Sequence, residues 1–476
     1  MIKEKTYIKT TKILAIVLVL LFVFSSIFPV MNAGSMNKKT SVNNSNTIVC
    51  ETDDYDLLII TIDSYVEPLN KLKTHKESFG IRTNIVTVSQ IYQEIGSTGR
   101  DNPEKIKYYI KNCADLSNIE FVLLVGNFKK VPVRYVHNQD VQQGFNEPTF
   151  ISELYYADIY DSEGGFSSWD SDGDGVFGEW IDDGVATEAE DKDIDLYPDV
   201  YVGRLACRNK VEVKTMVDKI ITYETGAYGQ DWSNRIVVAA GDTYPKYPTN
   251  EGEENTKHVL ENMSDYDQTT LWTSDGTLTG VQDIIREINK GCGFLYFDGH
   301  ANPFQWSTHP PEESKVWIRG LSILTMSLLM NKNMYPICVV GGCHNNQFDV
   351  HLGKLLEDPY YYFTFIPECW GWKLTRKIGG GSIATIGCSG LGMTKEDKDS
   401  FRGAGDFLEP SYFYEIGVNK TEYLGMAWGN AISGYLDEFP IDWNTPAAGD
   451  YAIDAKSVQQ SVLLGDPSLK IGGYDQ

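Results

Sequence analysis

The chain has 476 residues, 42% of them hydrophobic and 22% charged, which is the balance of an ordinary globular protein. Its formal net charge of −25 argues against a general nucleic-acid binder, because there is no positive excess to displace counterions from phosphates. A chain of this length buries a full core without disulfide bonds, and its acidic surface favours solubility in a salty or extracellular medium.

The N-terminus has the order of an export signal. Four lysines precede an apolar run from Ile13 to Val30, and small residues follow from Ala33. We therefore predict a signal peptide over residues 1–33. The run is also long enough to remain as a signal anchor, so the protein is expected to be secreted or held at the cell surface. Residues 34–54 are polar and are expected to form a flexible leader.

The first half of the folded chain alternates apolar runs with helical patterns, which is typical of a parallel α/β unit. Strands are predicted at 55–61, 83–88, 120–126 and 199–204, and helices at 66–79, 103–116 and up to 223. Residues 137–198 are rich in Asp, Gly, Ser and aromatics and are predicted to form an ordered insertion. We expect an N-terminal α/β subdomain over residues 55–226.

A second α/β series follows. Strands are predicted at 235–241, 293–297, 336–341 and 382–387, and helices at 279–290, 319–331 and 423–436. We expect a C-terminal subdomain over residues 227–473, with mainly parallel sheets flanked by helices in both subdomains. The two series could be similar halves of one enzyme.

The insertion contains a candidate metal loop. Asp170, Asp172 and Asp174 alternate and lead to a turn glycine, which is how a Ca²⁺ loop begins. The twelfth position is an isoleucine, so Glu179, or one of the aspartates at 182 and 183, would have to complete the ligands. The alternative is an exposed acidic turn. We predict structural Ca²⁺, with ligands from Asp170, Asp172, Asp174 and Glu179, and no organic cofactor.

Two loops after predicted strands carry reactive side chains. The segment FLYFDGHA (294–301) delivers His300 after a glycine, and ICVVGGCHN (337–345) delivers Cys343 after two glycines. If the strands are neighbours, both side chains emerge at one edge of the sheet. A nearby imidazole can take the proton of a thiol, and glycines let backbone amides approach a reacting carbonyl. The residues alone leave open that both side chains are structural.

Four segments carry a resemblance to a known family. They are GHANPFQW (299–306), GGCHNNQF (341–348), GGSIATIGCSG (380–390) and LLGDPSL (463–469). They resemble the gingipain-type cysteine peptidases, of the clan that includes caspases and legumain. The resemblance covers roughly residues 55–473 and implies a caspase-like fold, with the catalytic subdomain in the second half.

The resemblance also implies residue roles. Cys343 would be the nucleophile and His300 the acid and base, while Asp199, shorter than the family's usual glutamate, would orient His300. The amides of Ala301 and Cys343 would form the oxyanion hole. His344, beside the nucleophile, is unusual and is expected to face solvent.

The function implied is that of a secreted cysteine endopeptidase, which hydrolyses peptide bonds through a Cys-His dyad and a thioester acyl-enzyme. The alternative is an inactive surface-exposed binding or cell-wall protein that retains the fold. Protein or peptide substrates are expected, no nucleic acid, and a membrane only if the N-terminal segment is retained. Eight cysteines without a CxxC spacing make a zinc knuckle unlikely, and some could pair in an exported chain.

Overall fold

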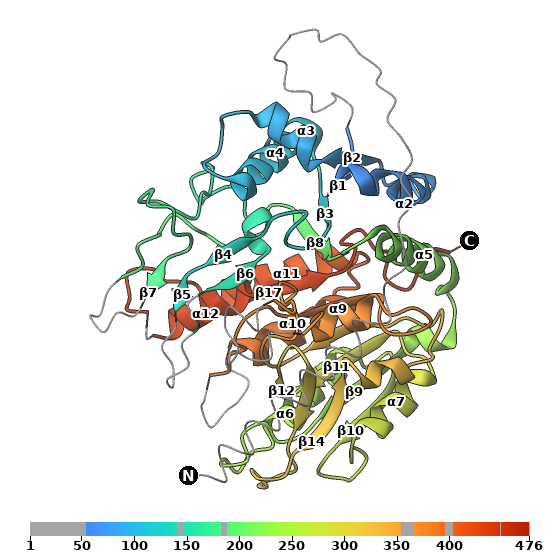
Figure 1. Ribbon diagram of the computed structural model, residues 1–476. Helices are drawn as coiled ribbons and strands as arrows, with labels where there is room; N and C mark the ends of the chain where they lie inside the picture. Colours follow the sequence, from blue (N-terminus) through green and yellow to red (C-terminus); the bar gives the residue numbers. More distant parts are fainter. Residues whose placement is uncertain are drawn as a thin grey trace, which may run out of the picture. The chain divides into compact units, whose positions relative to one another are not determined.

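The computed structural model describes residues 54–139, 147, 149–181, 188–353, 366–395, 403–447 and 449–475. Two mainly parallel sheets organise these residues, one in each half of the chain (Figure 1). The predicted signal segment and residues 34–53 of the leader lie outside the described residues. None of the described helices combines the length and the apolar composition required to cross a bilayer.

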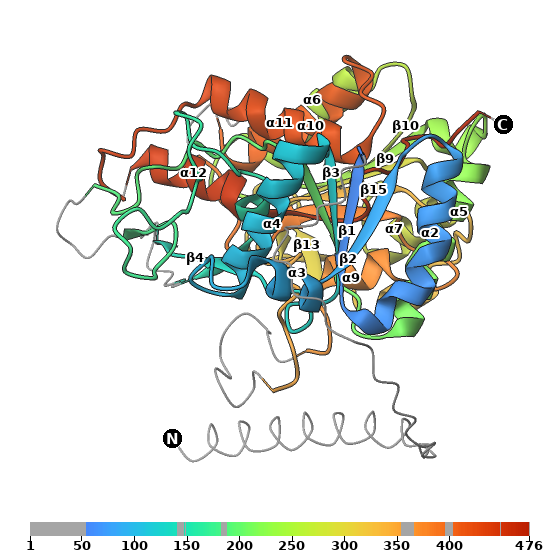
Figure 2. The ribbon, with the colours of Figure 1, turned by 90° about the horizontal axis from the view of Figure 1, so that it is seen from above.

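The first sheet is fully parallel and has the strand order β2-β1-β3-β8. Its strands are β1 (Leu57–Thr61), β2 (Thr83–Thr87), β3 (Phe121–Val125) and β8 (Tyr201–Leu205). Strands β1 and β3 are buried along their whole length, as their continuous apolar runs predict. Helices pack in pairs on the two faces (Figure 2): α2 (Val66–Ser78) with α5 (Lys210–Gly226), and α3 (Val88–Ile95) with α4 (Asn102–Ser117).

The insertion between β3 and β8 forms two small sheets in its described part. Strand β4 (Arg134–Val136) pairs antiparallel with β6 (Phe150–Ser152), and β5 (Asn138–Gln139) pairs with β7 (Trp180–Ile181). The side chains of Trp169 and Trp180 are fully buried beneath it. This aromatic core explains why a segment rich in Asp and Gly is ordered.

The second sheet has the order β10-β9-β11-β15-β16-β17, parallel except for the last pair. The four predicted strands are confirmed as β9 (Arg235–Ala240), β11 (Phe294–Asp298), β15 (Ile337–Val340) and β16 (Ala384–Cys388). The edge strands β10 (Asp267–Trp272) and β17 (Ser461–Leu464) were not predicted. Strand β10 is half-exposed and carries no continuous apolar run, which explains its weak signal.

The second sheet has helices on both faces. They are α6 (Glu251–Asn262), α7 (Val281–Asn289), α9 (Trp370–Thr375), α10 (Gly405–Gly417), α11 (Leu424–Glu438) and α12 (Asp450–Gln459). Helix α10 packs against both α6 and α11 on one face (Figure 2). Helices α7 and α11 confirm the predicted helices at 279–290 and 423–436.

The predicted helix over 319–331 is wrong. Its first residues form strand β14 (Ile318–Ser322), and a 3₁₀ helix at Thr325–Leu328 follows. Strand β14 pairs with β13 (Gln305–Thr308), which pairs with β12 (His300–Ala301). A Cβ atom on Gly320 would lie 2.4 Å from the ring of Trp306, so the strand lies flat against that ring. Its apolar residues pack against the ring in a strand, although the same residues are compatible with a helix.

The C-terminal segment ties the two halves together. Buried Lys76 of α2 forms ion pairs with Glu224 of α5 at 2.7 Å and with Asp466 at 2.9 Å. Asp466 belongs to the LLGDPSL segment, and a Cβ on Gly203 of β8 would lie 2.6 Å from the carbonyl oxygen of Gly465. The last strand and its following turn therefore pack directly on the first sheet.

Candidate active site

Parallel pairing of β11 with β15 brings the two predicted reactive loops to one edge of the second sheet. Phe297 lies opposite Val340, so the loops that follow leave the sheet side by side. This confirms the predicted neighbourhood of the two strands. Gly342 has φ of 99°, and a Cβ there would lie 2.5 Å from the amide nitrogen of Ala301. Only glycine allows the nucleophile loop to approach the histidine loop this closely.

His300 is oriented by a backbone carbonyl. Its Nε2 lies 2.8 Å from the carbonyl oxygen of Thr243, in the loop after β9. Because a carbonyl only accepts, Nε2 carries the proton and Nδ1 is left to accept one. Burial lowers the pKa of His300, and the bond to Thr243 opposes that shift only in part. The resting imidazole is therefore neutral and basic at Nδ1.

Cys343 is the partly exposed member of a group of free thiols. Cys207, Cys292, Cys338, Cys369 and Cys388 are free and buried. The Cys343 Sγ lies 3.8 Å from the carbonyl oxygen of Gly392. Burial and the charge of Glu147 raise the pKa of this thiol to about 11, although the Gly392 contact and Lys456 lower it. The resting group is a thiol, so attack requires a base to remove its proton.

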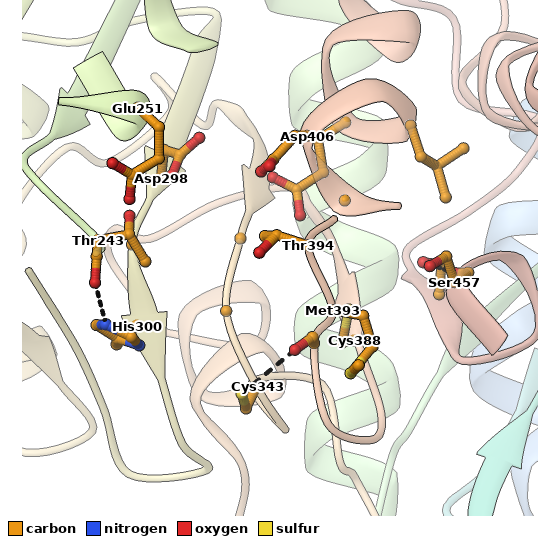
Figure 3. A pocket seen from close by; sticks show the side chains of 18 of the residues that line it. Thr243, Glu251, Asp298, His300, Cys343, Cys388, Met393, Thr394, Asp406 and Ser457 are labelled. Atoms are coloured by element: carbon orange, nitrogen blue, oxygen red, sulfur yellow. Dashed lines mark hydrogen bonds between the residues drawn. The ribbon is translucent and has the colours of Figure 1, made fainter. Parts of the chain in front are cut away.

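His300 and Cys343 line one cavity (Figure 3). Figure 3 shows Glu251 and Asp298 on the side of Thr243 and His300, with Asp406 across from them. The acidic lining residues are Glu251, Asp298, Asp406 and Glu409. Among the described residues that line this cavity, none is a lysine or an arginine. The cavity therefore joins a nucleophile and a base to a strongly acidic interior.

The interior carboxylates are crowded in a medium of low polarity. Burial raises the pKa of Asp298 to about 6, although its bonds from Asn255 and Tyr296 oppose the shift. Burial, with the charges of neighbouring carboxylates, raises the pKa of Glu251 to about 8 and that of Glu409 well above its ordinary value. Burial therefore disfavours the ionised forms of these acids, and a cation in the cavity would favour them. This cluster was missed in the sequence, because three of its four members lie on helices α6 and α10, which the pattern did not predict.

The predicted oxyanion amides come from the adjoining backbones. Asn345 shapes the loop between them, because its Nδ2 donates to the carbonyl oxygens of Gly342 at 2.9 Å and Val340 at 3.1 Å. These bonds curl the chain around Cys343 and leave the amide of Cys343 in the same turn. The amide of Ala301 lies against Gly342, as the close approach above shows. An oxyanion hole formed by these two amides stays a prediction.

His344 does not face solvent, and that expectation is wrong. Its side chain is 1% exposed and its Nε2 lies 3.5 Å from the carboxylate of Glu147. Glu147 also pairs with Lys456 of α12 at 2.9 Å and accepts from the amide of Leu391. His344 has φ of 55°, a backbone conformation that residues with a side chain rarely adopt. The buried contacts from His344 to Glu147 and from Glu147 to Lys456 hold this strained residue in place.

The structure does not bring Asp199 to His300. Asp199 precedes β8, at the amino end of a strand in the other sheet, and its carboxylate accepts from the amides of Ile159 at 2.6 Å and Tyr160 at 2.9 Å. It is not among the residues lining the cavity. The carbonyl of Thr243 occupies the position predicted for the carboxylate. A carbonyl leaves no mark in a sequence, so residue patterns could not find it.

The predicted calcium loop gathers its carboxylates. One oxygen each of Asp170, Asp172 and Asp174 lies within 4.8 Å of the other two. Asp170 accepts from the amides of Gly173 at 2.8 Å and Gly175 at 3.0 Å, and Arg100 pairs with it. Burial and neighbouring acids raise the pKa of Glu179 to about 7. The predicted alternatives at 182 and 183 lie outside the described residues.

Comparisons with known proteins show the family of this chain. The model of peptidase family C25 matches residues 51–472. Gingipain R2 of Porphyromonas gingivalis is 21% identical over 305 residues, which are 63% of this chain and 34% of the relative. Lys-gingipain HG66 of the same organism is 22% identical over 255 residues, 52% of this chain and 12% of the relative. The chain thus spans about a third or less of these relatives' length.

Solved structures show the same fold. The crystal structure of the Arg-specific cysteine proteinase gingipain R superimposes with a TM-score of 0.61 at 17% identity, over 91% of this chain and 80% of that one. The complex of the pro- and mature domains of RgpB from Porphyromonas gingivalis gives 0.59 at 17% identity, over 87% and 79%. With its two α/β sheets in the caspase-like arrangement, the chain belongs to peptidase family C25, the gingipain family of cysteine-type endopeptidases.

Proposed function

We propose that the chain is a cysteine endopeptidase that acts through a thioester acyl-enzyme formed on Cys343. The observation that carries the proposal is the shared cavity, which His300 and Cys343 line together. The neutral imidazole presents a basic Nδ1, and the thiol is protonated and needs a base. His300 therefore supplies the base that the thiol of Cys343 requires.

The reaction follows from these states. Nδ1 of His300 takes the thiol proton, and the thiolate of Cys343 attacks the carbonyl carbon of the scissile bond. The amides of Ala301 and Cys343 meet the negative charge that forms on the carbonyl oxygen. When the C–N bond breaks, the imidazolium gives its proton to the leaving amine. Water, deprotonated by the same imidazole, then hydrolyses the thioester and restores the thiol.

The substrate we propose carries a basic side chain on the residue before the scissile bond. The four carboxylates line the same cavity as Cys343, with no lysine or arginine among the described lining residues. An ammonium or guanidinium group would neutralise them and release their protons. The names of two similar proteins, Lys-gingipain and Arg-specific gingipain R, agree with such a preference.

A positional peptide library, cleaved under reducing conditions with calcium, tests the proposal. We expect cleavage after Lys or Arg, and labelling of wild type but not of Cys343→Ala by a thiol-reactive peptide probe with Arg before its warhead. Cleavage after neutral residues would reject the basic preference and keep the peptidase. Absence of both cleavage and labelling in folded wild type would favour the inactive binding protein.

We also propose that Ca²⁺ binds the loop of Asp170, Asp172 and Asp174, with Glu179 as a further ligand. The raised pKa of Glu179 reflects burial and uncompensated neighbouring charge, and oxygen ligands of this kind suit Ca²⁺. The ion would neutralise the loop and order the insertion. Binding to the folded state alone stabilises by about 2.7 kcal/mol at a hundredfold excess over Kd.

Thermal melting in EGTA and in millimolar calcium checks the calcium proposal. We expect a lower Tm in EGTA, and Asp172→Ala with Asp174→Ala should remove the response to added calcium. A matched double change outside the loop, Asp193→Ala with Glu188→Ala, should keep it. Equal wild-type melting temperatures in the two buffers would leave the loop an acidic turn.

We infer a secreted or cell-surface location from the order of charged, apolar and small residues at the N-terminus. N-terminal sequencing of the exported protein tests this, because a cleaved signal would remove about the first 33 residues. An intact N-terminus in a membrane fraction would show a retained anchor.

A further inference from the structure

An exposed tryptophan stands beside the catalytic histidine. Trp317 lies just before β14, and its side chain is 50% exposed. Its ring centroid is 5.3 Å from that of His300 and 3.8 Å from that of His309. Neighbouring Val316 is 44% exposed. An exposed indole next to the proposed base can contact a substrate bound there.

The loop that carries Trp317 is anchored. His309 is buried, and its Nδ1 lies 2.7 Å from the carbonyl oxygen of Val316. Its carbonyl accepts from the amide of Asp242 at 2.9 Å, and the carboxylate of Asp242 accepts from the amide of Glu312 at 2.9 Å. The start of the loop is therefore fixed to the segment after β9, and its end is fixed to His309. Trp317 is held beside His300 by these contacts and by its tilted ring contact with His309.

The chemistry places a substrate residue at this position. In the proposed reaction His300 protonates the leaving nitrogen, so that nitrogen must lie within hydrogen-bond reach of the imidazole. The leaving nitrogen belongs to the first residue after the scissile bond, the P1′ residue. The side chain of that residue starts one bond from the nitrogen and must lie near His300.

We propose that Trp317 forms the P1′ subsite and favours a large apolar or aromatic side chain there. This inference rests on the proposed peptidase function and deepens it. The flat face of the indole offers an uncharged apolar contact surface, which suits Phe, Tyr, Leu or Met. A glycine at P1′ would leave the indole in water, and an acidic P1′ residue would lose its hydration against it.

Quenched peptides that differ only at P1′ test the subsite. We expect kcat/KM for P1′ Phe to exceed that for P1′ Gly by about tenfold in wild type, as an aromatic contact of this size gives. In Trp317→Ala the ratio should fall below about twofold, and in Trp317→Phe most of it should return. Because the ratio is internal to each variant, general damage to the fold would lower both rates and leave it unchanged.

A matched control is Tyr228→Ala, an aromatic residue 54% exposed after α5 and outside the cavity, which should keep the wild-type ratio. Active wild type with equal rates for P1′ Phe and P1′ Gly would overturn the subsite and leave the peptidase standing. A ratio that persists in Trp317→Ala would also overturn it. Failure of wild type to cleave any peptide would instead reject the proposed function.

Discussion

The two sheets share a plan, yet chemistry gathers beside one of them. In each, a central strand ends at a glycine of nearly the same φ, 152° at Gly126 after β3 and 154° at Gly299 after β11. The residue after the glycine is Asn127 in the first sheet and His300 in the second. The neighbouring strand on the same side leads to Cys207 in the first sheet and to Cys343 in the second.

The first edge is closed. Buried Arg204 donates to the carbonyl oxygen of Gly126 at 2.9 Å and pairs with Glu153, and the amide of Asn127 donates to the carbonyl oxygen of Cys207 at 3.1 Å. Cys207 is fully buried, and burial raises its pKa well above the ordinary value. A similar strand topology is therefore not sufficient to form an active site.

The second edge borders a cavity lined by Cys343 and by carboxylates, and none of the described lining residues is a lysine or an arginine. A similar strand arrangement thus borders a cavity in the second sheet and a packed, hydrogen-bonded interior in the first.

The largest effect is expected from the two cysteines. Cys343→Ala should lower kcat/KM by at least about a thousandfold, because no other group replaces the nucleophile. Cys207→Ala should keep the activity of the folded protein within about twofold and lower stability by about 1 kcal/mol through the small cavity it leaves. Peptide hydrolysis and thermal melting of both variants check this. Full activity in Cys343→Ala would show that Cys343 is not the nucleophile.

His300→Ala should cost about a hundredfold to ten-thousandfold in kcat, because both proton transfers depend on Nδ1. Asn127→Ala, at the equivalent place on the closed edge, should change kcat little. The measurement is single-turnover cleavage at several pH values. A greater loss in His344→Ala than in His300→Ala, with both variants folded, would show that the wrong histidine had been assigned.

The acidic interior should make stability depend on pH. The folded-state pKa of Glu251 is raised from 4.5 to about 8, so its contribution to stability is present below pH 4.5 and is lost as the pH rises through about 8. Glu251→Gln should therefore reduce the fall in Tm between pH 5 and pH 8.5. Glu254→Gln, more exposed on the same helix, should follow wild type. An unchanged dependence of Tm on pH in Glu251→Gln would show that burial does not raise the pKa of this carboxylate.

The smallest effect on catalysis is expected at Asp199. Since its carboxylate accepts two backbone amides and lies outside the cavity, Asp199→Asn should keep kcat/KM within about twofold. It should change the free energy of unfolding by less than about 1 kcal/mol, because both amides donate to one carboxylate oxygen and Asn keeps an oxygen that can accept them. Kinetics and thermal melting distinguish the roles. A tenfold loss of kcat at unchanged Tm would restore the orienting role.

Much of the fold was predictable, because its strands are continuous apolar runs. Strands β1, β3, β9, β11, β15 and β16 confirm the predicted ones. The helix predicted over 319–331 is wrong, and β10 and β17 were missed. Each of these segments lies at a sheet edge or against a single ring, where the local pattern is compatible with several structures and long-range packing decides.

Local sequence patterns identified His300 and Cys343 as candidates, since the glycines before them and the strands that lead to them are local features, and the family resemblance implied their roles. The sequence by itself also determined the acidic loop at Asp170, whose carboxylates the structure gathers. Only the tertiary structure decided the partner of His300, the burial of His344, the acidic cavity and the place of Trp317. These depend on a backbone carbonyl, on an ionic chain from distant segments and on helices α6 and α10 meeting beside β11. Contacts between residues far apart in the chain leave no local periodicity, so one sequence alone does not reveal them.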